Sequence, residues 1–153
     1  MGYYVQGNSH KFLLKAGNEV GIQAAIRELN THDELKNGGS YSGGEKKEVW
    51  FSWMNDFDYD KDFTTVELLE AVGFDDVDTD EEGNIIHLFY DGKTGQENLF
   101  LATLAPFIED GSIIEWKGEE DERWRWVFEG GEMFEEIEDS EPHYTRTGVI
   151  KPF

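Results

Sequence analysis

The stretch "TTVELLEAVGFDDVDTDEEGNIIHLFY", Thr64 to Tyr90, decides the expected fold, because it combines a helix with two strands. Thr64 and Glu67 form the S/T-x-x-E capping box that begins a helix, and Gly73 ends that helix as a left-handed residue. The buried stripe of the helix is apolar and consists of Val66, Leu68, Leu69 and Val72. Strands at residues 74–79 and 84–90 follow, joined by the turn sequence DEEGN. The stretch therefore predicts a helix next to an antiparallel hairpin.

The rest of the chain contains the same mixture of elements. Further strands are expected at residues 2–7, 10–15, 47–54, 112–118, 123–131 and 132–138. One more helix follows a cap at Asn18, and another begins at a second capping box, Thr94 with Glu97, and ends at Pro106. This order predicts an α+β fold with an antiparallel or mixed β-sheet and about three helices packed mainly on one face. Residues 1–138 are expected to form a single acidic α+β domain, and residues 139–153 a polar C-terminal tail.

Two neighbouring segments carry opposite signals. Residues 37–44, "NGGSYSGG", are rich in glycine and lack the spacing of a phosphate-binding loop, so we expect a flexible connection. Residues 47–54, "KEVWFSWM", place apolar side chains on both faces of an extended segment. They therefore predict a central strand of the sheet.

The composition allows one ordinary domain. The chain has 153 residues, of which 38% are hydrophobic and 14% aromatic, so a core can form in spite of the high charge. Cysteine is absent, which excludes disulfides, thiolate metal sites and a cysteine nucleophile. No apolar run approaches the about 18 residues of a membrane span, and no basic and apolar leader begins the chain. We expect a cytoplasmic protein without a membrane partner.

The negative charge is concentrated in the last two thirds of the chain. The net charge is −21, with 34 acidic and 13 basic residues, and residues 1–55 are neutral because they hold six of each. The whole excess therefore belongs to residues 56–153. A field of this sign repels nucleic acid and anionic membranes and attracts basic protein surfaces. Direct binding of nucleic acid is therefore not expected.

The first hypothesis is a non-catalytic binding protein whose carboxylates imitate the charge of nucleic acid and occupy a basic groove of a DNA- or RNA-binding protein or nuclease. Phage-encoded inhibitors of restriction or CRISPR nucleases offer an analogy, which rests on charge alone. The carboxylates form four clusters, at residues 56–62, 75–82, 119–122 and 132–141. The main candidate partner-binding residues are Asp56, Asp58, Asp60, Asp75, Asp76, Asp78, Asp80, Glu81, Glu82, Glu119, Glu120, Asp121 and Glu122. The alternative is a globular protein whose acidity serves only solubility.

The second hypothesis is a calcium-binding module. Counted from Asp56, the ligand positions 1, 3, 5, 7, 9 and 12 of a calcium loop hold Asp56, Asp58, Asp60, Asp62, Thr64 and Glu67. Position 6 holds Lys61, however, where the sharp turn of the loop requires glycine. The same letters also describe an acidic surface segment that leads into a helix cap. Both interpretations remain open on the sequence.

No catalytic motif is present, and we expect neither an enzyme nor a cofactor. The four histidines, His10, His32, His87 and His143, have no metal-ligand spacing. In "RWRWVF", residues 123–128, tryptophans and arginines alternate, so on a strand they occupy opposite faces. We expect the tryptophans to fill the core, and the arginines to pair with acids or stack on Trp116.

Overall fold

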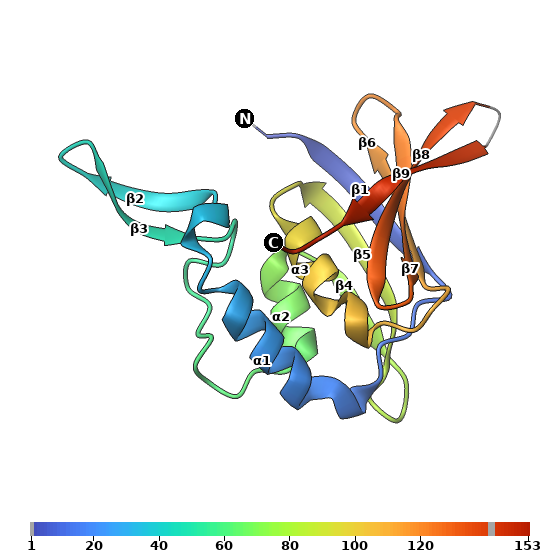
Figure 1. Ribbon diagram of the computed structural model, residues 1–153, viewed down its shortest axis with the longest axis horizontal. Helices are drawn as coiled ribbons and strands as arrows, with labels where there is room; N and C mark the ends of the chain where they lie inside the picture. Colours follow the sequence, from blue (N-terminus) through green and yellow to red (C-terminus); the bar gives the residue numbers. More distant parts are fainter. Residues whose placement is uncertain (1, 141–142) are drawn as a thin grey trace.

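A computed structural model describes residues 2–140 and 143–153 (Figure 1). Its strands are β1 (Tyr4–His10), β2 (Gly38–Ser42), β3 (Glu45–Trp50), β4 (Asp76–Thr79), β5 (Ile85–Lys93), β6 (Ile113–Gly118), β7 (Arg123–Glu129), β8 (Glu132–Ser140) and β9 (His143–Ile150). The α-helices are α1 (Glu19–Leu29), α2 (Thr65–Val72) and α3 (Glu97–Leu104). Short 3-10 turns cover Ala16–Asn18, Asp33–Leu35 and Ala105–Phe107.

Seven strands form one antiparallel sheet in the order β4-β5-β1-β6-β7-β8-β9, and the three helices cover one of its faces (Figure 1). In β1 the buried residues Val5, Gly7 and Ser9 alternate with exposed ones, so the other face of the sheet is open to solvent. The predicted α+β fold is confirmed. Within the described ranges, no helix is long and apolar enough to cross a membrane.

The capping box of α2 forms as the sequence predicts. The Glu67 backbone N–H donates to Thr64 Oγ1, and the Thr64 backbone N–H donates to Glu67 Oε1. Gly73 has φ 127°, a conformation that favours glycine. At α1 the expected cap is wrong, because the Asn18 side chain makes no cap hydrogen bond and a 3-10 turn leads into the helix instead.

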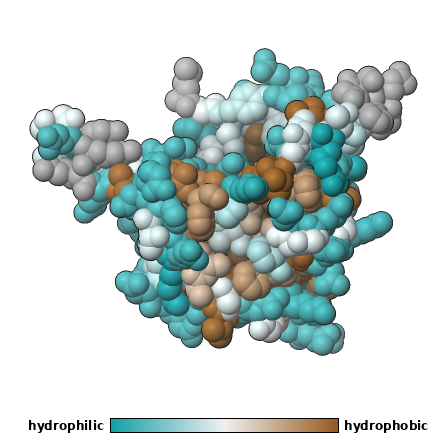
Figure 2. Space-filling view, in the orientation of Figure 1, coloured by the Kyte–Doolittle hydropathy of each residue, from teal (hydrophilic) through white to brown (hydrophobic). Residues whose placement is uncertain are grey.

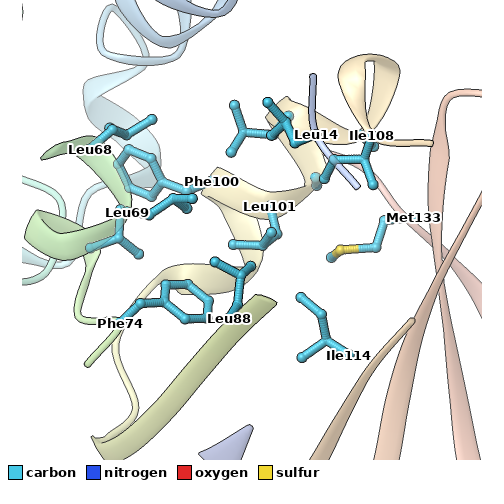
Figure 3. Packing of buried hydrophobic residues seen from close by; sticks show 14 of the residues in the cluster. Leu14, Leu68, Leu69, Phe74, Leu88, Phe100, Leu101, Ile108, Ile114 and Met133 are labelled. Carbon is cyan, nitrogen blue, oxygen red and sulfur yellow. The ribbon is translucent and has the colours of Figure 1, made fainter. Parts of the chain in front are cut away.

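The core lies between α3 and the sheet (Figure 3). Leu101 of α3 lies toward Leu88 of β5, whereas the Phe100 ring lies next to Leu68 and Leu69 of α2 and contacts Phe51. Ile114 of β6 and Met133 of β8 complete the sheet side of the core, and each of these side chains is at most 1% exposed. Leu68 and Leu69 of α2 close the core from the other side of α3. Because α3 is covered by α1, α2 and the sheet, five consecutive residues from Phe100 to Leu104 are buried.

The expectations for residues 37–54 are wrong. β2 and β3 pair with each other in a separate two-stranded hairpin that projects from the body of the protein (Figure 1). The glycine-rich segment is thus largely a strand, and Gly38 allows the Trp50 ring to lie against its backbone. The expected central strand instead divides after Trp50, since Phe51 and Met54 belong to a turn that enters the core. We name residues 38–50 the arm.

The expected polar tail is also wrong for its larger part, because His143 to Ile150 form β9, which pairs with β8 along its length. Residues 141–142 lie outside the described residues. β9 is an edge strand with one face in solvent, so polar side chains such as Arg146 and Thr147 fit it. Because these residues are mostly polar, the sequence of β9 lacks the apolar pattern that would have predicted a strand.

Two local expectations fail as well. Residues 10–15 do not continue as a strand: Lys11 has φ 54°, and Leu14 makes only isolated bridges. At α3 the N-cap is Gln96 and not Thr94, although Thr94 still donates a side-chain hydrogen bond to Glu97. The Gln96 side chain is turned toward the base of the arm, so it does not cap the helix.

Gln96 joins α3 to both ends of the arm. Its Oε1 accepts hydrogen bonds from the backbone N–H groups of Asn37 at 3.0 Å and Ser52 at 3.1 Å, and its Nε2 donates to the Leu35 carbonyl at 2.6 Å. The residue is 6% exposed. One buried amide therefore satisfies three backbone groups where the arm leaves the core.

Replacement of Gln96 by alanine is expected to destabilise the protein by about 2 kcal/mol or more, since each buried backbone group left unpaired costs about 1–3 kcal/mol. Urea unfolding measures this loss, and hydrogen exchange should accelerate first in β2 and β3. Gln6→Ala, on the exposed face of β1, is the matched control. Equal stability of the two variants would show that the hydrogen bonds of the Gln96 side chain do not contribute to the free energy of unfolding.

Candidate interaction surface

The antiparallel order of the strands places two acidic turns at opposite ends of the sheet. The turn of residues 119–122 joins β6 to β7 next to the start of β1, where Val5 pairs with Gly118. The turn of residues 80–84 joins β4 to β5 at the other end, where Leu14 bridges Ile85. The predicted partner-binding residues are therefore not one continuous row.

One group of carboxylates does come together, at the end of the sheet where β1 begins. The Asp91 backbone N–H donates to Asp75 Oδ2 at 2.6 Å, which joins the β4 edge to the end of β5. Asp91 in turn lines an open groove of about 420 Å³ with Glu119 and Asp121. Tyr4, 58% exposed, lines the same groove. We name this group the acidic rim; its members are Asp75, Asp91 and the turn residues Glu119, Glu120, Asp121 and Glu122.

Hydrogen bonds hold the turn of the rim in place. Glu119 Oε1 accepts from the Tyr4 backbone N–H at 2.6 Å, and Glu122 accepts from the Tyr3 hydroxyl. The hydrogen bond from Tyr3 lowers the pKa of Glu122, so this exposed carboxyl stays ionised to a lower pH than an ordinary glutamate. Asp121 has φ 67° and pairs with Lys117 at 3.3 Å. The Glu120 side chain makes no hydrogen bond or ion pair within the described part of the chain.

The β4 edge carries Asp76 and Asp78 on the face away from the helices. Asp76 pairs in register with Phe89, and Asp78 with His87. His87 lies between two acceptors, Asp78 at 3.2 Å and the side-chain oxygen of Asn8 at 2.7 Å. Carboxylates on an edge strand discourage pairing with another chain. Asp78 is thus engaged within the sheet, whereas Asp76 is available to a partner.

The opposite turn has a structural role for its first residue. Asp80 accepts hydrogen bonds from the backbone N–H groups of Glu82 and Asn84 and from the Asn84 side chain, all within 3.0 Å. The bond from the Asn84 side chain is the main reason why the pKa of Asp80 lies below its ordinary value. Glu81 and Glu82 project from this turn as exposed residues far along the sheet from the rim.

The loop of the calcium hypothesis packs against α1. Arg27 donates to the carbonyls of Tyr59 and Lys61, and Gln23 donates to Asp62 Oδ1. Asp58 accepts from the backbone N–H of Asp60, whereas Asp56 has no side-chain partner among the described residues. Across residues 2–140 and 143–153, no group of three or more His, Asp or Glu side chains is arranged to hold a metal ion. The ligand positions from Asp56 to Glu67 do not form a cage.

The arginines of β7 and β9 build an ion-pair network on the open face of the sheet. Glu136 is 7% exposed and accepts from Arg125 at 2.7 Å and from Arg146 at 2.9 Å. Arg125 also lies over the Tyr144 ring at 4.3 Å, and Arg146 over Phe134 at 4.3 Å. The first of the two expected arrangements, pairing with an acid, is therefore confirmed for Arg125, whose ring contact is with Tyr144 and not with Trp116.

Trp116 lies on the opposite face, within the core. It packs between Trp126 at 4.8 Å and Tyr90 at 5.5 Å. The predicted burial of the β7 tryptophans is confirmed for Trp126, which is 4% exposed, whereas Trp124 is only partly buried against the core. The fourth acidic cluster, residues 132–141, runs along β8. One member of this cluster, Glu136, belongs to the ion-pair network. The last residue of the cluster, Glu141, lies outside the described residues.

Sequence reasoning missed Asp91 and Tyr4 as members of this surface. No sequence signal links Asp91 to residues 119–122, because β1 separates β5 from β6 in the sheet. Comparisons with protein-family models, with curated proteins and with solved structures found no match. No relative therefore indicates a function for this chain.

Substitution Glu136→Gln is expected to destabilise the protein by about 2 kcal/mol at pH 7, because hydrogen bonds to charged groups contribute about 1.5–3 kcal/mol. Burial alone would raise the pKa of Glu136, but the hydrogen bonds from Arg125 and Arg146 outweigh it and lower the pKa. The stabilisation is thus complete above the ordinary glutamate pKa of about 4.3 and is lost as the pH falls through the lower pKa of the folded state.

Thermal unfolding of the Glu136→Gln variant and the unchanged protein at a series of pH values measures this effect. Their difference should shrink as the pH falls below about 4. Glu138→Gln changes the same strand at a side chain that makes no hydrogen bond within the described residues, so it should have little effect. A difference that persists at low pH would contradict the charge-based explanation.

Titration of calcium to about 1 mM is expected to give no binding heat and no rise in melting temperature. Glu67 is used as a helix cap, and Asp62 accepts a hydrogen bond from Gln23, so both would have to leave their partners to bind the ion. EDTA should likewise leave the melting temperature unchanged. A saturable heat that disappears in Asp60→Asn would establish the calcium module instead.

Proposed function

We propose that this chain is a non-catalytic binding protein that uses its acidic rim to dock on a basic protein surface, of the kind that normally holds DNA or RNA. The observation that carries the proposal is that three chain segments supply the rim: Asp75 immediately precedes β4, Asp91 belongs to β5, and the β6–β7 turn supplies four further carboxylates. Such a surface attracts lysine and arginine at a distance.

Two features of the rim support a protein partner over a small cation. Glu119 and Glu122 are held by hydrogen bonds from the Tyr4 backbone N–H and the Tyr3 hydroxyl, so these two side chains lose little freedom when a partner docks. Exposed Tyr4 lies among them and can cover a bound guanidinium by a cation–π contact. The occupant of the groove is thus an arginine or lysine side chain of the partner, and a nuclease or other nucleic-acid-binding protein supplies many of these.

A second candidate function of the negative charge is to keep the protein in solution, and the β4 edge suggests it. Asp76 and Asp78 lie on an exposed edge strand, where charge prevents edge-to-edge association. If the acidity serves only solubility, the position of each carboxylate is unimportant. The two functions therefore differ in whether relocating charge matters.

Capture of partners from a cell lysate tests the proposal. Basic proteins should bind at about 50 mM salt and elute by about 500 mM, because salt screens the attraction. Double-stranded DNA should also release them if the occupied groove is one that holds nucleic acid. Recovery of nothing more basic than the background would contradict the proposed function.

Two double variants of equal charge decide whether the rim is responsible. Asp91→Lys with Glu120→Lys reverses two rim carboxylates whose side chains make no hydrogen bond within the described chain, and partner binding should fall by about tenfold or more. Glu81→Lys with Glu82→Lys makes the same change in net charge at the opposite end of the sheet and should retain binding. Equal loss in both variants would assign the binding to net charge and not to the rim.

A further inference from the structure

A second surface, on the helix side of the molecule, differs from the rim in being apolar. Figure 2 shows apolar residues gathered near the middle of this face, in the region of α3 and the end of β9, within a mostly hydrophilic surface. A groove of about 210 Å³ lies between α1, α3 and the C-terminal residues. Its walls include Ala25, Ala102, Pro106, Val149, Ile150 and Pro152. We name it the helix-side groove.

The interior of the helix-side groove offers few hydrogen-bonding groups. Thr103 lines it, but its hydroxyl donates to the Leu99 carbonyl at 2.7 Å. Pro106 and Pro152 have no backbone N–H. The C-terminal wall is anchored, because Phe153 stacks on His32 with ring centroids 4.0 Å apart. The groove is therefore a formed site whose chemistry fits an apolar side chain.

The size of the groove selects the class of occupant. Pockets for cofactors and drug-sized ligands measure about 300–1,000 Å³. The helix-side groove, at about 210 Å³, is smaller and suits one large aliphatic or aromatic side chain that a partner segment inserts. Such anchors in small pockets supply much of the binding free energy in protein interfaces.

Charged residues at the edge of the helix-side groove favour a particular charge on that partner segment. Glu28 of α1 and Glu132 of β8 line it, and neither carboxylate has a hydrogen bond or ion pair in the described ranges. Lys151 is the one basic residue among the lining residues. Together with the net charge of −21, this favours lysine or arginine on either side of the inserted residue.

We infer that the helix-side groove binds a basic segment of a partner protein through one large apolar side chain. This inference rests on the proposed function, because it assumes a basic protein partner, and adds that the partner presents an apolar anchor. The acidic rim then supplies attraction at a distance, and the groove supplies contact burial that salt does not screen.

Labelled peptides provide a direct test with the full chain. The probe is a short peptide of lysine and glycine with one central phenylalanine, and its binding is followed by fluorescence anisotropy at about 50 mM salt. Replacement of phenylalanine by glycine should weaken binding by about tenfold or more, since a buried phenyl ring contributes that much. A glutamate and glycine peptide with the same phenylalanine should not bind.

Matched variants locate the site. Ala25→Trp should fill the groove and weaken the phenylalanine peptide by about tenfold, whereas Ala24→Trp, one residue along α1 and exposed, should not. If Ala25→Trp fails to fold, Glu28→Lys decides the matter against Glu70→Lys on α2, since both lie at exposed helix positions and only Glu28 lines the groove.

The outcomes separate this inference from the proposed function. Equal binding of the phenylalanine and glycine peptides, or equal effects of the paired variants, overturns the groove and leaves the rim untouched. Absence of binding by every basic peptide also overturns the groove, while lysate capture judges the rim independently. Backbone NMR signals of Ala25 and Val149 that shift with the protein's own concentration would identify a second copy as the occupant and overturn the inference.

Discussion

The burial of α3 between the sheet and the other two helices is the constraint on which the rest of the structure depends. Phe100, Leu101 and Leu104 are at most 1% exposed, so the helix has little freedom to move without opening the core. Its first turn is preceded by Gln96, which anchors the arm, and its last turn contributes Ala102 and Thr103 to the helix-side groove. Arm, core and groove therefore share one rigid support.

The second constraint is electrostatic. A chain with a net charge of −21 must place carboxylates where they repel one another little, and most of them lie in turns or on edge strands. Several of these carboxylates also stabilise the fold: Glu67 caps α2, Asp80 closes a turn, and Glu136 joins Arg125 to Arg146. The carboxylates left without such contacts, including Asp76 and Glu120, are those that a partner can use without opening the fold.

Local signals in the sequence predicted much of the local structure, although the caps expected at Asn18 and Thr94 are wrong. The capping box at Thr64 and Glu67, the hairpin of β4 and β5 and the inward face of β7 all depend on residues close together in the chain, and all of them form. The largest failure occurred where the signal was ambiguous in itself. Residues 47–54 looked like a central strand because the apolar residues of the arm and of the turn that enters the core are adjacent in sequence.

By itself, the sequence determined the α+β class, the order of the three helices, and the location of all excess charge in residues 56–153. Only the tertiary structure decided that β9 forms the edge strand next to β8 and that the two acidic turns lie at opposite ends of the sheet. It also decided that Asp91 lines one groove with Glu119 and Asp121. The physical reason is that strand order in an antiparallel sheet depends on packing between distant segments, whereas caps, turns and alternation depend on neighbours.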